Sequence, residues 1–90
     1  MPDYSQSKIY KIYSKSLNLS YIGSTTQLLH LRLKGHQYAY KYWTENGLKY
    51  CMSYEVLKGG DAEISLVCDF PCDTKHELFI KEGEFMLNTE

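Results

Sequence analysis

The alternation of apolar and polar residues near the start of the chain predicts a β-hairpin. Residues 8–13 (KIYKIY) alternate with a period of two, residues 14–18 are polar enough for a turn, and residues 19–23 (LSYIG) form the returning strand. Because side chains alternate along a strand, Tyr10 and Tyr21 share a face of this hairpin only if the connecting loop has an even number of residues. The pattern leaves that loop length open.

A helix over residues 26–43 is predicted to follow the hairpin. Ser24 and Gln27 have the spacing of a capping box, and good helix formers come after them. Apolar residues at helical spacing form a stripe that we expect to pack against the sheet: Leu28, Leu31, Ala39 and Tyr42. Residues spaced four apart form a second stripe on a common face: Arg32, His36 and Tyr40.

The second half of the chain predicts two more strands. Asn46-Gly47 and residues 58–61 (KGGD) are turn signals, so we expect strands over residues 49–57 and 62–70, the second of them ended by Pro71. With the helix described next, the order becomes strand, strand, helix, strand, strand, helix. This order predicts the α+β class, with a small antiparallel or mixed sheet flanked by helices.

A C-terminal helix is predicted to start at Asp73 or Thr74. Thr74 and Glu77 have the spacing of a second capping box. Four apolar residues are expected to supply the contacts of this helix: Leu78, Phe79, Phe85 and Met86.

Composition and charge limit the classes of protein to which the chain can belong. The chain has 90 residues, so we expect one domain over residues 1–90 with a thin core. It is 43% hydrophobic and 23% charged, which is ordinary for a globular fold. It has neither a membrane-length apolar run nor a signal-peptide pattern at its start, so we expect an intracellular protein without a membrane partner. The net charge of −1 means that any contact with nucleic acid is local or is helped by another module.

The three cysteines, Cys51, Cys68 and Cys72, are odd in number, so reduced thiols in a cytosolic or nuclear setting are the simpler interpretation. Cys68, Cys72 and His76 form a C-x3-C-x3-H series that raises the alternative of zinc. Structural zinc usually takes four ligands in tighter pairs, and Cys68 belongs to an apolar strand, so small buried or half-buried thiols are favoured.

Taken singly, the polar residues that could carry chemistry have ordinary explanations. Strand tyrosines usually pack, and a lone arginine, histidine or glutamate on a helix is usually solvated. Taken together, however, these residues belong to a series of motifs in a fixed order along the chain. The ordered elements are KIY at 8–10, YIG at 21–23, STTQ at 24–27, L-x-x-R-L-x-x-H at 29–36, and KEGEFM at 81–86. This series resembles the GIY-YIG nuclease family over nearly the whole chain.

The resemblance implies an endonuclease that depends on Mg²⁺ or Mn²⁺ and hydrolyses DNA one phosphodiester bond at a time. It implies a site made of five side chains: Tyr10, Tyr21, Arg32, His36 and Glu82. Glu82 is the implied metal ligand, chosen over Glu77 and Glu84 because an aromatic and an apolar residue follow it at the family's spacing.

The chemistry of the reaction suits these residue types. Phosphodiester hydrolysis needs a deprotonated water and neutralisation of charge on the phosphate oxygens. A guanidinium is a planar fork suited to phosphate, and Mg²⁺ often takes one or two carboxylates while keeping its waters. A tyrosine, with an ordinary pKa of about 10, needs nearby cations to act as a base. We expect Tyr10 to be the base with help from His36, and Tyr21 to orient the water or the phosphate.

Two positions depart from the family pattern. Lys8 stands where glycine is commonest, and Asn88 follows Glu82 too soon to match the family's asparagine, so we expect a domain trimmed at its C-terminus. Family members are commonly joined to a separate DNA-binding module. The pathway stays open among repair, intron mobility, restriction and viral genome processing, and oligomeric state and target sequence stay open too.

Two other functions are kept as alternatives. One is a noncatalytic nucleic-acid binding module that stacks bases on strand tyrosines. The other is a structural or protein-interaction domain that keeps only the fold.

Overall fold

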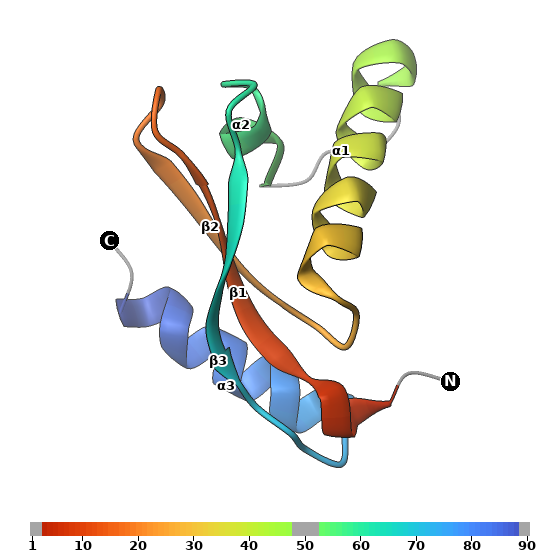
Figure 1. Cartoon of the computed structure of the whole chain (residues 1–90), viewed down its shortest axis with the longest axis vertical. Coiled ribbons are helices and arrows are strands. Elements are labelled where there is room, and N and C mark those ends of the chain that lie inside the picture. The colour runs from red at the N-terminus through yellow and green to blue at the C-terminus, as the bar shows by residue number, and fades with distance from the viewer. Residues whose placement is uncertain (1–2, 48–52, 89–90) are drawn as a thin grey trace.

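The computed structural model describes residues 3–47 and 53–88, and the side chains of the last helix as far as Phe85. A three-stranded antiparallel sheet in the order β2-β1-β3 forms the centre (Figure 1). Its strands are β1 (Lys8–Ser14), β2 (Leu19–Thr25) and β3 (Glu63–Asp69). The helices are a 3₁₀ turn η1 (Tyr4–Gln6), α1 (Leu29–Asn46), α2 (Ser53–Leu57) and α3 (Lys75–Asn88). The predicted α+β class is confirmed.

The hairpin of β1 and β2 has a four-residue turn, Lys15–Asn18. Asn18 has φ of +52°, a left-handed conformation that asparagine tolerates better than most residues. The even loop length gives a register in which Tyr10 pairs with Gly23 and Ile12 pairs with Tyr21. Tyr10 and Tyr21 therefore lie on the same face of the sheet, two positions apart on the diagonal.

Alternation along β1 divides the core between the two faces of the sheet. Ile9 faces α3 and packs with Ile22 and Leu78. Tyr10 and Ile12 face the other way, where Val56 of α2 and the partly buried Leu29 and Leu33 of α1 pack against them. Helices thus cover both faces, with α1 and α2 on one side of the sheet and α3 on the other (Figure 1).

Helix α1 turns a different face to the sheet than the hydrophobic pattern predicts. Leu28 is 61% exposed, Leu31 47% and Tyr42 57%, and Ala39 is exposed as well. The stripe of Arg32, His36 and Tyr40 faces inward instead, with His36 buried and the other two half-buried. The reason is that Leu29 and Leu33 flank this stripe and supply its apolar contacts, so the polar residues are carried into the interior with them.

The start of α1 also differs from the prediction. The residue before the helix is Leu28, and no side chain caps it, because Ser24 is still part of β2. The predicted capping box of Ser24 and Gln27 is therefore wrong. At the other end, the helix runs to Asn46, three residues beyond the predicted end at Trp43, and Gly47 with φ of +66° ends it.

The strand predicted over residues 49–57 is wrong in its described part. Residues 49–52 lie outside the described residues, and residues 53–57 form α2. This segment does not join an edge of the sheet but lies on its face, where Val56 packs against Tyr10 and Ile12. The segment SYEVL is short enough to suit either a strand or a helix. As a helical turn it buries Tyr54, Val56 and Leu57.

The C-terminal elements follow the prediction closely. Strand β3 ends just before Pro71, and a register shift opposite Ile9 and Tyr10 makes a β-bulge in its pairing with β1. The Oγ1 of Thr74 accepts from the Glu77 N–H at 3.3 Å, and the Glu77 carboxylate accepts from the Asp73 N–H at 3.0 Å, so α3 is capped as predicted. Within residues 3–47 and 53–88, no helix has the length and apolarity to cross a membrane.

Candidate active site

Tyr10 lies at the centre of the candidate site. It sits in the middle strand and has no exposed surface. Its hydroxyl oxygen lies 2.7 Å from His36 Nε2 and accepts a hydrogen bond from Arg32 Nε at 3.3 Å. The sequence spacing explains this convergence, because Arg32 and His36 are one helical turn apart on the face of α1 that packs above Tyr10.

Gly23 of the YIG motif makes room for Tyr10. It is the cross-strand partner of Tyr10, and a Cβ placed on Gly23 would collide with the Tyr10 hydroxyl and ring. A residue with a side chain at this position cannot keep the present position of the ring. The motif glycine and the motif tyrosine are thus parts of one packing arrangement.

His36 is buried and stays neutral at pH 7. Burial, with a smaller contribution from the positive charge of Arg32, lowers its pKa from 6.5 to about 4. Its Nδ1 lies 3.0 Å from the Oγ of Ser53 at the start of α2. We assign the neutral tautomer from the network: Arg32 donates to Tyr10, Tyr10 donates to Nε2, and Nδ1–H donates to Ser53.

Tyr21 forms the side of the same cluster. Its ring centroid lies 6.5 Å from that of Tyr10 and 5.6 Å from that of His36, the latter in an edge-to-face arrangement. It is half-buried, whereas Tyr10 is fully buried. Of the two rings, only that of Tyr21 is therefore accessible from solvent.

Glu82 is not part of this cluster of four. It lies on α3, where its carboxylate accepts a hydrogen bond of 2.5 Å from the hydroxyl of Ser24. Ser24 pairs with Ile9, whose side chain faces α3, while Tyr10 faces α1. Glu82 thus reaches the end of β2 from the opposite face of the sheet. The expectation of five side chains around one point is met by four of them.

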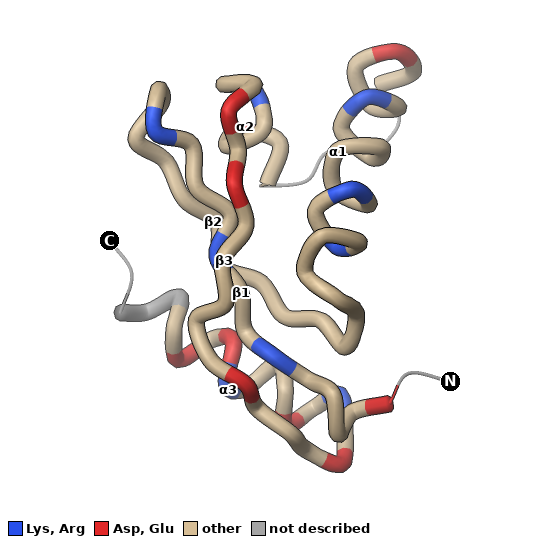
Figure 2. The backbone as a smooth tube through the Cα atoms, in the orientation of Figure 1, with Lys and Arg blue, Asp and Glu red and all other residues tan. Residues whose placement is uncertain are grey.

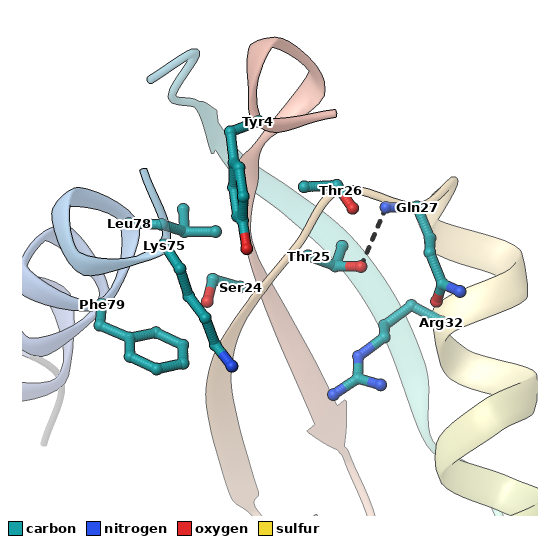
Figure 3. Close-up of a pocket in the computed structure, with 9 residues that line it drawn as sticks. All are labelled: Tyr4, Ser24, Thr25, Thr26, Gln27, Arg32, Lys75, Leu78 and Phe79. Carbon is teal, nitrogen blue, oxygen red and sulfur yellow. Dashed lines mark hydrogen bonds between the residues drawn. The ribbon is translucent and has the colours of Figure 1, made fainter. Parts of the chain in front are cut away.

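A pocket at the end of β2 connects the two faces. It has a volume of about 500 Å³ and is lined by Tyr4, Ser24, Thr25, Thr26, Gln27, Arg32, Lys75, Leu78 and Phe79 (Figure 3). Arg32, which contacts Tyr10, and Ser24, which contacts Glu82, both line it. Because β2 is an edge strand, no further strand covers it among the described residues. One residue of the cluster and the hydrogen-bond partner of Glu82 thus line the same pocket.

Lys8 helps to shape the same region. Its ammonium donates to the main-chain carbonyl of Gln27 at 2.9 Å and to that of Gln6 at 2.9 Å. These bonds tie the segment before α1 to the start of β1. The lysine at the first position of the KIY motif thus has a structural role here.

The donors around Glu82 fit a magnesium-type ion better than zinc. Within the described residues, no group of three or more His, Cys, Asp or Glu side chains is gathered to hold a metal ion. Cys68 and Cys72 are free thiols, and Cys51 lies outside the described residues. One carboxylate beside a hydroxyl is an all-oxygen set, which suits Mg²⁺ or Mn²⁺ that retains most of its waters.

Comparison of the chain with models of protein families, with curated proteins and with solved structures gave no match. The resemblance to the GIY-YIG family therefore rests on the motif residues of the sequence.

Two residues of the site have no signal in the sequence pattern. Ser53 lies within the segment predicted as a strand, residues 49–57, and Ser24 has the spacing of a helix cap, so neither was expected to contact His36 or Glu82. Both contacts join segments far apart in the chain, 17 residues in one case and 58 in the other. Residue spacing alone carries no information on such contacts.

Proposed function

We propose that this protein is a divalent-metal-dependent DNA endonuclease of the GIY-YIG type that nicks one strand at a time. The observation that carries the proposal is the hydrogen-bonded series Arg32–Tyr10–His36, in which a buried phenol is held between a permanent cation and a neutral imidazole. A buried phenol in a protein core needs one hydrogen-bond partner, but it does not need a permanent cation as well. The pairing of a cation with a proton acceptor is what a tyrosine base requires.

In the proposed reaction, the oxygen of Tyr10 receives the proton of the attacking water as its own proton moves to His36 Nε2. Arg32 lies beside the Tyr10 oxygen, where its positive charge favours the phenolate form and its terminal amino groups can bind a phosphate oxygen. Tyr10 has no solvent contact in this conformation, so this step requires a side chain above it to move when substrate binds. Tyr21 is placed to orient the water or the phosphate.

Glu82 would hold Mg²⁺ or Mn²⁺, with Ser24 fixing the carboxylate through its hydrogen bond. Bound there, the ion would neutralise charge on the phosphate and help the leaving oxygen depart. The phosphate itself would lie across the edge of β2, between the side chains of Arg32 and Glu82.

The alternative of a noncatalytic module that stacks bases is less well supported. Stacking needs an exposed ring face, and Tyr10 has none. Tyr21 is half-buried and packs edge-on against His36. The alternative also gives no reason for a neutral histidine bonded to the Tyr10 hydroxyl.

A plasmid-nicking assay with Mg²⁺ or Mn²⁺ tests the proposal. We expect the wild type to convert supercoiled DNA to the nicked form, and Glu82→Ala and Arg32→Ala to abolish this. Glu84→Ala is the matched control, because Glu84 lies on the same helix, is exposed, and pairs with Lys81 at 3.2 Å. DNA binding without cleavage at any concentration of either metal would favour the noncatalytic module. Full activity in Glu82→Ala would contradict the assignment of the metal ligand.

A further inference from the structure

The charged residues that line the pocket at the end of β2 are both cations. The protein as a whole has a net charge of −1, yet the described residues that line the pocket include Arg32 and Lys75 and no carboxylate. Resting on the proposed function, we propose that this pocket holds the DNA backbone beside the reacting phosphate, with Lys75 as an anchoring residue opposite Arg32. Lys75 belongs to none of the motifs that suggest a nuclease.

The position of Lys75 is not explained by helix stability. It is the first residue of α3, where the helix dipole favours negative side chains and a lysine is unfavourable. Its ammonium lies 5.1 Å from the ring centroid of Phe79, which also lines the pocket. This contact holds the charge over the pocket mouth while the ammonium can still donate hydrogen bonds to an anion.

Arg32 offers the second cation from the other side. Its bond to Tyr10 uses Nε, and the terminal nitrogens of the guanidinium extend toward the same end of the pocket as the Lys75 ammonium (Figure 3). The two cations come from α1 and α3, on opposite faces of the sheet. A DNA strand that crosses the edge of β2 would therefore meet one cation on each side.

The balance of charge differs between the two helices beside the pocket. Helix α1 carries Arg32, Lys34 and Lys41 against one carboxylate, Glu45, whereas α3 carries Lys75 and Lys81 against Glu77, Glu82 and Glu84 (Figure 2). Of these residues, only Arg32 and Lys75 line the pocket. Beyond Arg32 and Lys75, hydroxyl side chains line the pocket at Ser24, Thr25 and Thr26. Permanent cations with hydroxyl neighbours and no lining carboxylate are the usual surroundings of a backbone phosphate.

The test measures DNA binding apart from cleavage. A fluorescein-labelled DNA duplex is titrated in metal-free buffer with EDTA at several KCl concentrations, using wild type, Lys75→Ala, Lys75→Arg and Lys15→Ala. Lys15 is the matched control, an exposed lysine in the β1–β2 turn with the same change of charge. We expect Lys75→Ala to weaken binding about fivefold and to reduce the slope of log K against log[KCl] by about 0.9, the value for one lost phosphate contact. Lys75→Arg and Lys15→Ala should bind like the wild type.

Further readouts separate anchoring from a structural role. Thermal unfolding of Lys75→Ala should occur at or above the wild-type temperature, because a cation in the first helical turn is lost. In steady-state cleavage, KM should rise while kcat changes less than twofold.

The outcomes also separate this inference from the proposed function. If DNA binding depends on Lys75 but no variant cleaves DNA, the proposal that the pocket binds DNA is supported and the proposed endonuclease activity is contradicted. If the wild type cleaves DNA but Lys75→Ala keeps the wild-type affinity and salt slope, the proposal that the pocket binds DNA is contradicted. The proposed endonuclease activity would then still stand. Equal losses in Lys75→Ala and Lys15→Ala would overturn it as well, because they would reflect net charge alone.

Discussion

The hydroxyl of Tyr10 lies directly against the backbone of Gly23, its partner across the hairpin. A methyl group on Gly23 would occupy the space of this hydroxyl, so Gly23→Ala must displace the ring and its bonds to Arg32 and His36. We expect Gly23→Ala to lower the free energy of unfolding by about 1–3 kcal/mol, the usual cost of overpacking, and to abolish cleavage. Urea unfolding and the nicking assay measure the two effects.

Gly35→Ala is the control for this substitution. Gly35 lies within α1, and a Cβ there meets nothing within 4 Å. Because alanine favours helix, we expect Gly35→Ala to raise the free energy of unfolding by up to about 1 kcal/mol and to leave cleavage unchanged. A Gly23→Ala variant as stable and active as Gly35→Ala would contradict the packing described here.

Tyr10→Phe and Tyr21→Phe distinguish the base from the orienting residue. Both variants keep the ring and delete one hydroxyl. If Tyr10 is the base, Tyr10→Phe lowers kcat by roughly 10²-fold or more. Tyr21→Phe, whose ring keeps its edge-on packing with His36, should have the smaller effect on kcat. The reverse order in single-turnover cleavage would transfer the base role to Tyr21.

Burial of neutral His36 predicts a loss of stability in mild acid. The unfolded chain takes up a proton on this histidine near pH 6.5 and the folded chain only near pH 4, so the unfolded state binds more protons between these values. The free energy of unfolding should fall as the pH falls through this window, by about 2 kcal/mol between pH 7 and pH 5. Urea unfolding at a series of pH values measures the change.

His36→Gln serves as the reference for the pH effect. Glutamine cannot titrate, so the curve of this variant should be flatter over the same range, whatever its stability at pH 7. Parallel curves for the wild type and His36→Gln would show that other groups cause the acid sensitivity.

Packing of α3 against the sheet depends on Leu78. This residue is buried between Ile9 and Ile22, so Leu78→Ala should cost about 2–5 kcal/mol of unfolding free energy. Leu31→Ala, on the outward face of α1, should change it by less than about 0.5 kcal/mol. Denaturant unfolding of the two variants compares the two faces directly. A large loss in Leu31→Ala would mean that α1 buries the stripe predicted from sequence.

The sequence by itself determined the features that depend on neighbours along the chain. The period-two pattern and the turn residues predict the hairpin, and with it the pairing of the KIY and YIG segments. The four-residue spacing of Arg32 and His36 predicts that they share a helix face, and the Thr74 and Glu77 spacing predicts the start of α3. Each of these follows from the geometry of a single strand, turn or helix, which needs no information about the rest of the fold.

Only the tertiary structure decided which surfaces meet. Leu29 and Leu33 carry Arg32 and His36 inward, although the pattern favours the stripe of Leu28 and Leu31. Residues 53–57 pack on the face of the sheet instead of at its edge, as a helix whose Ser53 contacts His36. The meeting of Ser24 with Glu82 at the edge of β2 likewise depends on how α3 packs. Packing between distant segments depends on shape and available space, and residue spacing along one chain records neither.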